Sequence, residues 1–181
     1  MNWEPFFRAE LERVKEKQQH WDQLALRARQ TRQGELRGLI LAMSADMQAI
    51  QHLEQTLIEI YDNIDHLNPK TGDQMGLALC LHHIYSAMES IFERINHTYD
   101  HIPSTANVRP AVISDALYQQ LDEYRSFRHV VRYAYDYTLD WNKLERLVSK
   151  IPSVIHEFRA EMDVFVRYVQ ASIQAHDSEG M

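Results

Sequence analysis

A heptad spacing of large apolar residues is the feature of this sequence that most restricts its fold. These residues recur at every seventh position, at Leu36, Met43, Ile50, Leu57 and Ile64. Because an α-helix has about 3.6 residues per turn, this spacing places the whole set on one face. Residues 36–64 are therefore predicted to form one long bundle helix, and apolar residues upstream predict another helix, with Gly34 as a candidate break between them.

Three later stretches repeat apolar residues at intervals of three and four, at 77–102, 117–134 and 144–165. The breaks between them fall at "NPKTGD", which begins at Asn68, and at "PSTANVRP", which begins at Pro103. Each stretch therefore predicts an amphipathic helix with one buried stripe.

Two polar residues stand where these helices should begin. Ser114 and Asp140 precede the third and last apolar stretches, and both residue types favour the N-cap position. Pro152 lies inside the last stretch and predicts a kink or a break there.

Few residues of the chain interrupt helices. Only five glycines and five prolines occur among 181 residues, and 45% of the residues are hydrophobic. We therefore expect one all-α domain over residues 1–181, an antiparallel four- or five-helix bundle. The single cysteine, Cys80, excludes an intrachain disulfide and is expected in the core, which fits a reducing compartment.

The termini, apolar segments and net charge bear on location and partners. The first residues alternate charged and apolar types, unlike a signal peptide, and no segment is apolar enough to span a bilayer. We therefore expect a cytoplasmic protein without membrane contact. A net charge of −7 argues against indiscriminate binding of nucleic acid but leaves room for a local basic patch.

Ten histidines raise the question of a metal site. The best arrangement is "HTYDH", in which His97 and His101 are one helical turn apart beside Asp100. No second ligand motif accompanies it, and the adjacent His82 and His83 point about 100° apart on a helix. We therefore expect neither a metal nor another cofactor.

The segment "RSFRHVVRYAYDY", residues 125–137, concentrates basic and aromatic side chains in an acidic chain. At about 100° per residue, Arg125, Arg128 and Arg132 fall within an arc of roughly 60°, and Tyr135 lies about 20° beyond Arg128. The apolar side chains are expected on the opposite side, at Phe127, Val130, Val131 and Ala134. Two interpretations stay open. The arginines face an anionic partner, or they form a solvated face paired with nearby acids such as Asp122, Glu123 and Asp136.

The sequence "FRHVVRYAYDYTLDW" resembles the signature region of HEPN-domain proteins, in particular HepT-like toxins of HEPN/MNT toxin–antitoxin pairs. The motif of that family is Arg, four residues, His, one residue, Tyr. It places the arginine at Arg128, the histidine position at Tyr133 and the tyrosine at Tyr135. The helix "LALCLHHIYSAMESIFERI" is similar to the preceding family helix, so the resemblance covers about residues 75–170.

The resemblance implies a helical homodimer that acts as a metal-independent endoribonuclease, with a cleft at the dimer interface. Its implied partner is a minimal nucleotidyltransferase antitoxin that transfers AMP to the motif tyrosine, here Tyr135. Arg128 would stabilise the phosphate of the RNA substrate during attack by the ribose 2′-hydroxyl. Arg125 and Arg132 would then bind RNA.

Tyr133 departs from the family motif. A phenol with a reference pKa of about 10 is roughly one part in a thousand ionised at pH 7, so it replaces the histidine poorly as a general acid or base. Three explanations stay open: a natural variant, a substitution that relieves toxicity, or a surrogate base at His129. On an ideal helix His129 lies about 100° and Tyr133 about 140° from Arg128, so neither converges on that arginine without a kink or a second protomer.

Three functional hypotheses follow. The first is the ribonuclease toxin, weakened at Tyr133. The second is a non-catalytic HEPN module that binds RNA, a nucleotide or a partner protein through its arginine face. The third is a structural bundle whose arginines form surface ion pairs.

Overall fold

The structure, a computed structural model, describes residues 4–100, 111–133 and 139–178. Side chains at 100, 132, 133, 176–178 and most positions before residue 30 lie outside this description. The helices are α1 (Glu4–Asn63), α2 (Thr71–Asp100), α3 (Asp115–Tyr133) and α4 (Trp141–Ser178). The described ranges contain no strand, which confirms the all-α prediction, and the number of helices is four.

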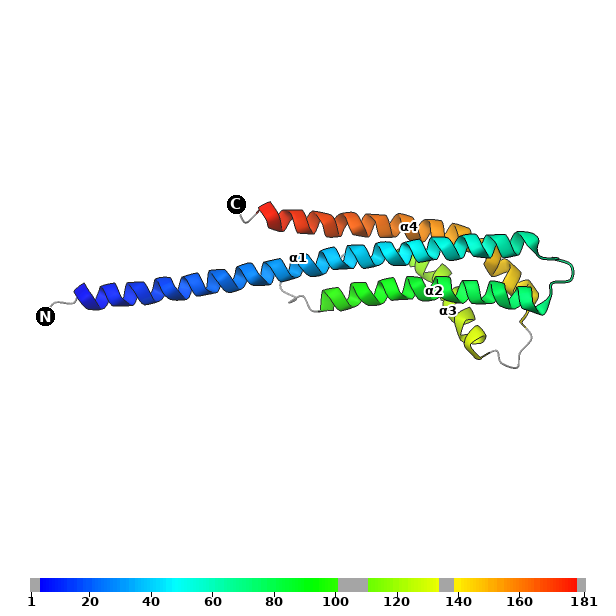
Figure 1. Cartoon of the computed structure of the whole chain (residues 1–181), viewed down its shortest axis with the longest axis horizontal. Coiled ribbons are helices and arrows are strands. Elements are labelled where there is room, and N and C mark those ends of the chain that lie inside the picture. Colours follow the sequence, from blue (N-terminus) through cyan, green and yellow to red (C-terminus); the bar gives the residue numbers. More distant parts are fainter. Residues whose placement is uncertain (1–3, 101–110, 134–138, 179–181) are drawn as a thin grey trace.

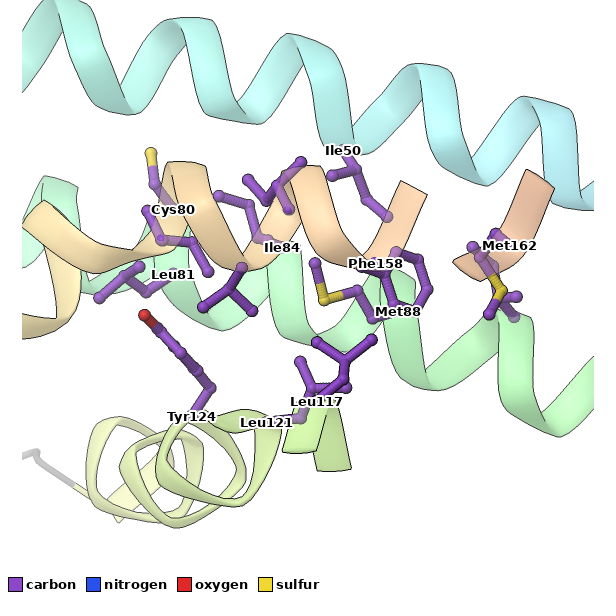
Figure 2. Close-up of a cluster of buried hydrophobic side chains, with 14 of the residues drawn as sticks. Ile50, Cys80, Leu81, Ile84, Met88, Leu117, Leu121, Tyr124, Phe158 and Met162 are labelled. Atoms are coloured by element: carbon purple, nitrogen blue, oxygen red, sulfur yellow. The ribbon is translucent and has the colours of Figure 1, made fainter. Parts of the chain in front are cut away.

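Three helices run along the long axis of the molecule, and the fourth lies across them. α1 and α2 form an antiparallel hairpin, and α4 lies along α1, also in the opposite direction (Figure 1). The N-terminal part of α1 projects beyond the ends of α2 and α4 (Figure 1). The shorter α3 is steeply inclined to the other three helices and is seen almost end-on in Figure 2.

The break considered at Gly34 is absent, because α1 runs without interruption from Glu4 to Asn63. A glycine inside a helix costs about 1 kcal/mol relative to alanine, which the good helix formers on either side can outweigh. The helix ends where Asp65 turns the chain. Its carboxylate accepts hydrogen bonds from the backbone N–H groups of Leu67 and Asn68, at 3.1 and 3.3 Å.

The core lies between α1, α2 and α4 and is closed by the inner face of α3. Nearly all the apolar residues that the spacing predicted to be inside are buried, including all five heptad residues of α1 and also Cys80. In Figure 2 Leu117, Leu121 and Tyr124 point from α3 toward side chains of the other helices. The sequence periodicity thus identified the buried faces of α1, α2 and α4 correctly.

Both predicted caps are present. The Ser114 hydroxyl accepts a hydrogen bond from the Leu117 N–H at 3.2 Å, and the Asp140 carboxylate accepts one from the Asn142 N–H at 3.0 Å. Glu161 of α4 in turn accepts hydrogen bonds from the Ser114 N–H and hydroxyl, both at 2.7 Å. The start of α3 is therefore fixed both by its own cap and by α4.

Pro152 does not break the last helix, since α4 continues to Ser178. A proline inside a helix has no N–H for the carbonyl four residues earlier, here that of Val148. The carbonyl of the residue before it, Leu147, accepts a hydrogen bond from the buried Tyr124 hydroxyl at 3.0 Å. Burial, as the main cause, and the charge of Glu123 both raise the pKa of Tyr124. The phenol therefore keeps its proton near neutral pH and can donate this hydrogen bond between α3 and α4.

None of the helices within the described ranges is long and apolar enough to cross a membrane.

Candidate functional site

Arg128 lies on α3 at the margin of the buried face. On an ideal helix it is about 20° from Leu121 and about 40° from Tyr124, both of which are buried in the core. Its guanidinium reaches across to α2, where Nη1 lies 2.7 Å from Glu89 Oε2. The side chains are only 25% and 33% exposed, so this ion pair is partly shielded from solvent.

The guanidinium of Arg128 keeps further hydrogen-bonding capacity. Its Nε atom is buried and finds no hydrogen-bond partner among the described residues. An unsatisfied buried donor costs about 1–3 kcal/mol, more when it belongs to a charged group. Glu89 thus fixes the guanidinium at one nitrogen, and because Nε is buried, a second anion can reach Arg128 only at the exposed part of its guanidinium.

Arg125 lies on the solvent side of Arg128 and is paired on its own helix. Its Nη2 atom lies 2.5 Å from Asp122 Oδ1, and both side chains are exposed. Such an exposed pair, three residues apart on a helix, contributes about 0.2–0.5 kcal/mol. Asp122 is one of the acids considered above for a solvated face, and a pair this weak yields readily to a stronger anion.

Tyr85 of α2 is the third polar group at this junction. Burial, as the largest cause, and the charges of Glu89 and Asp122 raise the pKa of its phenol, while Arg125 and Arg128 act in the opposite direction. The phenol is therefore neutral at pH 7 and lies within the electrostatic field of both ion pairs. Two arginines, two carboxylates and one phenol meet where α3 crosses α2.

A groove of about 600 Å³ opens beside this junction, between α2, α3 and residues 111–113. Its polar lining residues are Tyr85, Asn96, Asp122 and Arg125. The remaining lining is apolar or aromatic: Phe92, Ile95, Ala111, Val112, Ile113, Tyr118 and Leu121. A groove of this size and mixed lining is typical of sites that bind small organic groups.

Of the other predicted site residues, the structure describes only the side chain of His129. His129 is exposed, and its side chain leaves α3 about 100° from that of Arg128. Arg132 and Tyr133 belong to the last turn of α3, but their side chains lie outside the described part of the chain. Tyr135 lies wholly outside the described residues.

The expectation that Val130 lies on the apolar side of α3 is wrong, because this side chain is 45% exposed. α3 packs through Leu117, Leu121, Tyr124 and Phe127, and Val130 lies about 180° from Leu121 on an ideal helix. The centre of the buried face of α3 therefore lies closer to Arg128, and farther from Val130, than the composition of the segment suggested.

Sequence reasoning did not single out Tyr85 and Glu89. They are four residues apart on α2 and therefore share one helix face, which the spacing could have revealed. Nothing in the spacing, however, tells which face of α2 meets α3. That information comes only from the crossing of the two helices.

The histidine-based metal hypothesis gains no support. His97 is exposed near the end of α2, and His101 lies outside the described residues. Among the side chains that the structure describes, no group of three or more His, Cys, Asp or Glu is arranged to hold a metal ion.

Comparison with known families bears directly on the α3 segment. A family model described as HepT-like protein matches residues 101–169, which include all of α3 and most of α4. This segment is HepT-like. The match confirms the resemblance seen in the arginine- and tyrosine-rich sequence, and it contains Arg128, Tyr133 and Tyr135. It covers less than half of the chain and begins after α2.

Over this segment the chain is similar to a HEPN toxin-like module. No curated protein and no solved structure gave a match.

Proposed function

We propose that this protein is the toxin of a HEPN/MNT pair, a metal-independent endoribonuclease in which Arg128 stabilises the phosphate under attack. The observation that carries the proposal is the HepT-like match over the motif segment. The position of Arg128 agrees with this role, because Glu89 holds the guanidinium while leaving part of it for an anion. A planar cation with several fixed donors suits a phosphate that gains charge in the transition state.

Tyr133 limits the activity in this proposal. Loss of a general acid or base typically lowers the rate about 10²- to 10⁴-fold, and a phenol is a poor substitute at pH 7. Tyr133→His should therefore increase RNA cleavage by a factor in this range. A surrogate base at His129 makes a different prediction, because His129→Ala would then abolish the residual activity.

The test compares RNA cleavage by the wild type, Tyr133→His, and Tyr133→His combined with Arg128→Ala, all in the presence of a metal chelator. We expect Tyr133→His to increase cleavage above that of the wild type and the added Arg128→Ala to abolish it. Arg94→Ala is a matched control, because Arg94 forms an ion pair with Asp46 on α1 and does not line the groove. Absence of cleavage in every variant, on a broad mixture of cellular RNA, would refute the ribonuclease proposal.

We further propose that the nucleotidyltransferase partner neutralises the toxin by AMP transfer to Tyr135. The support is the tyrosine at the family position within the matched segment. Intact-mass spectra after co-expression with the product of an adjacent nucleotidyltransferase frame should show one added AMP, and Tyr135→Phe should lack it. AMP found on another residue, or on none, would contradict this step.

A homodimer is part of the proposal, because the helical geometry of α3 separates Arg128 from position 133 within one protomer. The test mixes the wild type with a chain carrying both Arg128→Ala and Tyr133→His. Only a cleft shared between protomers combines the arginine of one chain with the histidine introduced in the other. Activity of the mixture above that of either chain alone supports the shared cleft, and no gain after subunit exchange contradicts it.

The second candidate is a binding module without catalysis. It is favoured by the groove of about 600 Å³ beside Arg125, whose mixed lining is typical of binding sites. In that case RNA binding is salt-sensitive and depends on Arg125 and Arg132, and Tyr133→His produces no cleavage. The pairing of Arg125 with Asp122 and of Arg128 with Glu89 supports instead the third hypothesis, a face of surface ion pairs.

A further inference from the structure

The groove between α2 and α3 offers a place for a flat ring next to the arginines. Phe92 forms part of its wall and is itself supported from behind, since its ring packs edge-on against the buried Phe158 at a centroid distance of 5.7 Å. Tyr118 of α3 also lines the groove, yet its side chain is 56% exposed. One wall is therefore fixed by the core, and a large aromatic side chain stands at the rim.

An exposed tyrosine at the edge of an apolar groove is the arrangement that proteins use to stack unpaired bases. Single-stranded nucleic acid is bound largely by base–aromatic stacking combined with basic groups that follow the backbone. Here the apolar wall and Tyr118 provide the first element. Arg125 in the lining, with Arg128 one helical turn further along α3, provides the second.

The lining of the groove also includes a group that can recognise the edge of a base. Asp122 lines the groove and uses one carboxylate oxygen for Arg125, so the other oxygen can accept a hydrogen bond. A carboxylate accepts from the amino or imino groups of a base. The phosphate of a nucleotide bound this way would lie toward the two arginines.

We propose that this groove binds the base of the RNA nucleotide adjacent to the phosphate that Arg128 contacts. The choice of RNA as ligand rests on the proposed function, whereas the stacking site rests on the groove itself. Tyr118 and Phe92 provide the stacking surfaces, and Arg125 directs the backbone toward Arg128.

The test uses a short single-stranded DNA with one 2-aminopurine, which lacks the 2′-hydroxyl and cannot be cleaved by the proposed route. We expect binding to quench the 2-aminopurine fluorescence. Tyr118→Ala should weaken the affinity about fivefold or more, since base–aromatic stacking contributes at least about 1 kcal/mol. Tyr118→Phe, which keeps the ring, should bind like the wild type, and so should Leu41→Ala, which removes an exposed apolar side chain of α1 away from the groove.

An oligonucleotide with an abasic residue in place of the 2-aminopurine provides the second comparison. It should bind the wild type more weakly than the base-containing oligonucleotide and should not distinguish Tyr118→Ala from the wild type. Equal affinity of the wild type and Tyr118→Ala for the base-containing oligonucleotide, or absence of binding, overturns the proposal.

The two proposals fail in different ways. RNA cleavage that depends on Arg128 but not on Tyr118 leaves the ribonuclease intact and eliminates the base site. Binding that depends on Tyr118, without cleavage in any Tyr133→His variant, supports the base site and eliminates the ribonuclease.

Discussion

Removal of the carboxylate that holds Arg128 should make this protein less stable and at the same time a tighter binder of RNA. The change is Glu89→Gln, which keeps the size of the side chain and removes its charge. In the proposed function the RNA phosphate competes with Glu89 for the positive charge of Arg128, which Glu89 already partly neutralises. The substitution removes the negative charge of Glu89 from that competition.

The magnitude follows from the geometry of the ion pair. Hydrogen bonds to charged groups contribute about 1.5–3 kcal/mol when buried, whereas fully exposed ion pairs contribute about 0.2–1 kcal/mol. With 2.7 Å between Nη1 and Oε2 and about a quarter to a third of each side chain exposed, this pair should contribute about 1 kcal/mol. Glu89→Gln should therefore lower the free energy of unfolding by about 1 kcal/mol and tighten RNA binding up to about fivefold.

The assays are urea denaturation and fluorescence anisotropy with a non-cleavable single-stranded oligonucleotide at two salt concentrations. Asp46→Asn is the matched control, because it removes the same charge from another ion pair of α2, that of Arg94 with Asp46 at 3.0 Å. The control should lower stability but leave most of the affinity unchanged. Unchanged or weaker RNA binding by Glu89→Gln, or an equal gain in the control, would refute the competition between Glu89 and phosphate.

Three further predictions concern the bundle. Tyr124→Phe removes the 3.0 Å hydrogen bond to Leu147 O and should lower the unfolding free energy by about 1 kcal/mol in urea denaturation. Since burial raises the pKa of Tyr124 in the folded state, the wild type should lose stability as the pH rises above 10.0, the ordinary pKa, and Tyr124→Phe should lose less. Phe158→Ala should cost about 3–5 kcal/mol, as this ring is fully buried, and Phe158→Leu clearly less by the same measurement. Gly34→Ala should stabilise the protein by about 0.5–1 kcal/mol, seen as a higher melting temperature, because an added Cβ meets nothing within 4 Å; a lower melting temperature would contradict this.

The buried faces of the long helices could be predicted from the sequence because each of them is set by a local rule. Helical periodicity alone places Leu36 and Ile64 on one line, and both are buried. The caps at Ser114 and Asp140 were predictable for the same reason, since a cap depends on a few adjacent residues. The continuity of α1 across Gly34 also depends on local propensities. The helix-breaking tendency of the glycine and the helix-forming tendency of its neighbours are too similar in size for the apolar spacing to tell which one prevails.

The composition of the candidate site could not be predicted in this way, because it depends on how α3 crosses α2. Arg128 was expected on the face opposite the apolar side chains but lies at the margin of the buried face, and its partner was sought among acids nearby in the sequence. Glu89 lies 39 positions earlier in the sequence and became a partner only through the crossing of the two helices. Val130 is a different case, because its position about 180° from the buried Leu121 was already contained in the helical spacing and was overlooked in favour of its apolar character.

The position of Arg128 at the edge of the core also bears on how the motif can work. α3 is helical through Tyr133, and on an ideal helix positions 128 and 133 are about 140° apart, while the Arg128 side chain reaches α2. A catalytic pair within one protomer would need α3 to unwind between these positions, at the expense of the packing of Phe127 and the ion pair with Glu89. The homodimer that we propose avoids this loss, because in it position 133 comes from the second chain. The mixing experiment with Arg128→Ala and Tyr133→His therefore tests whether the motif needs two chains or an unwound α3.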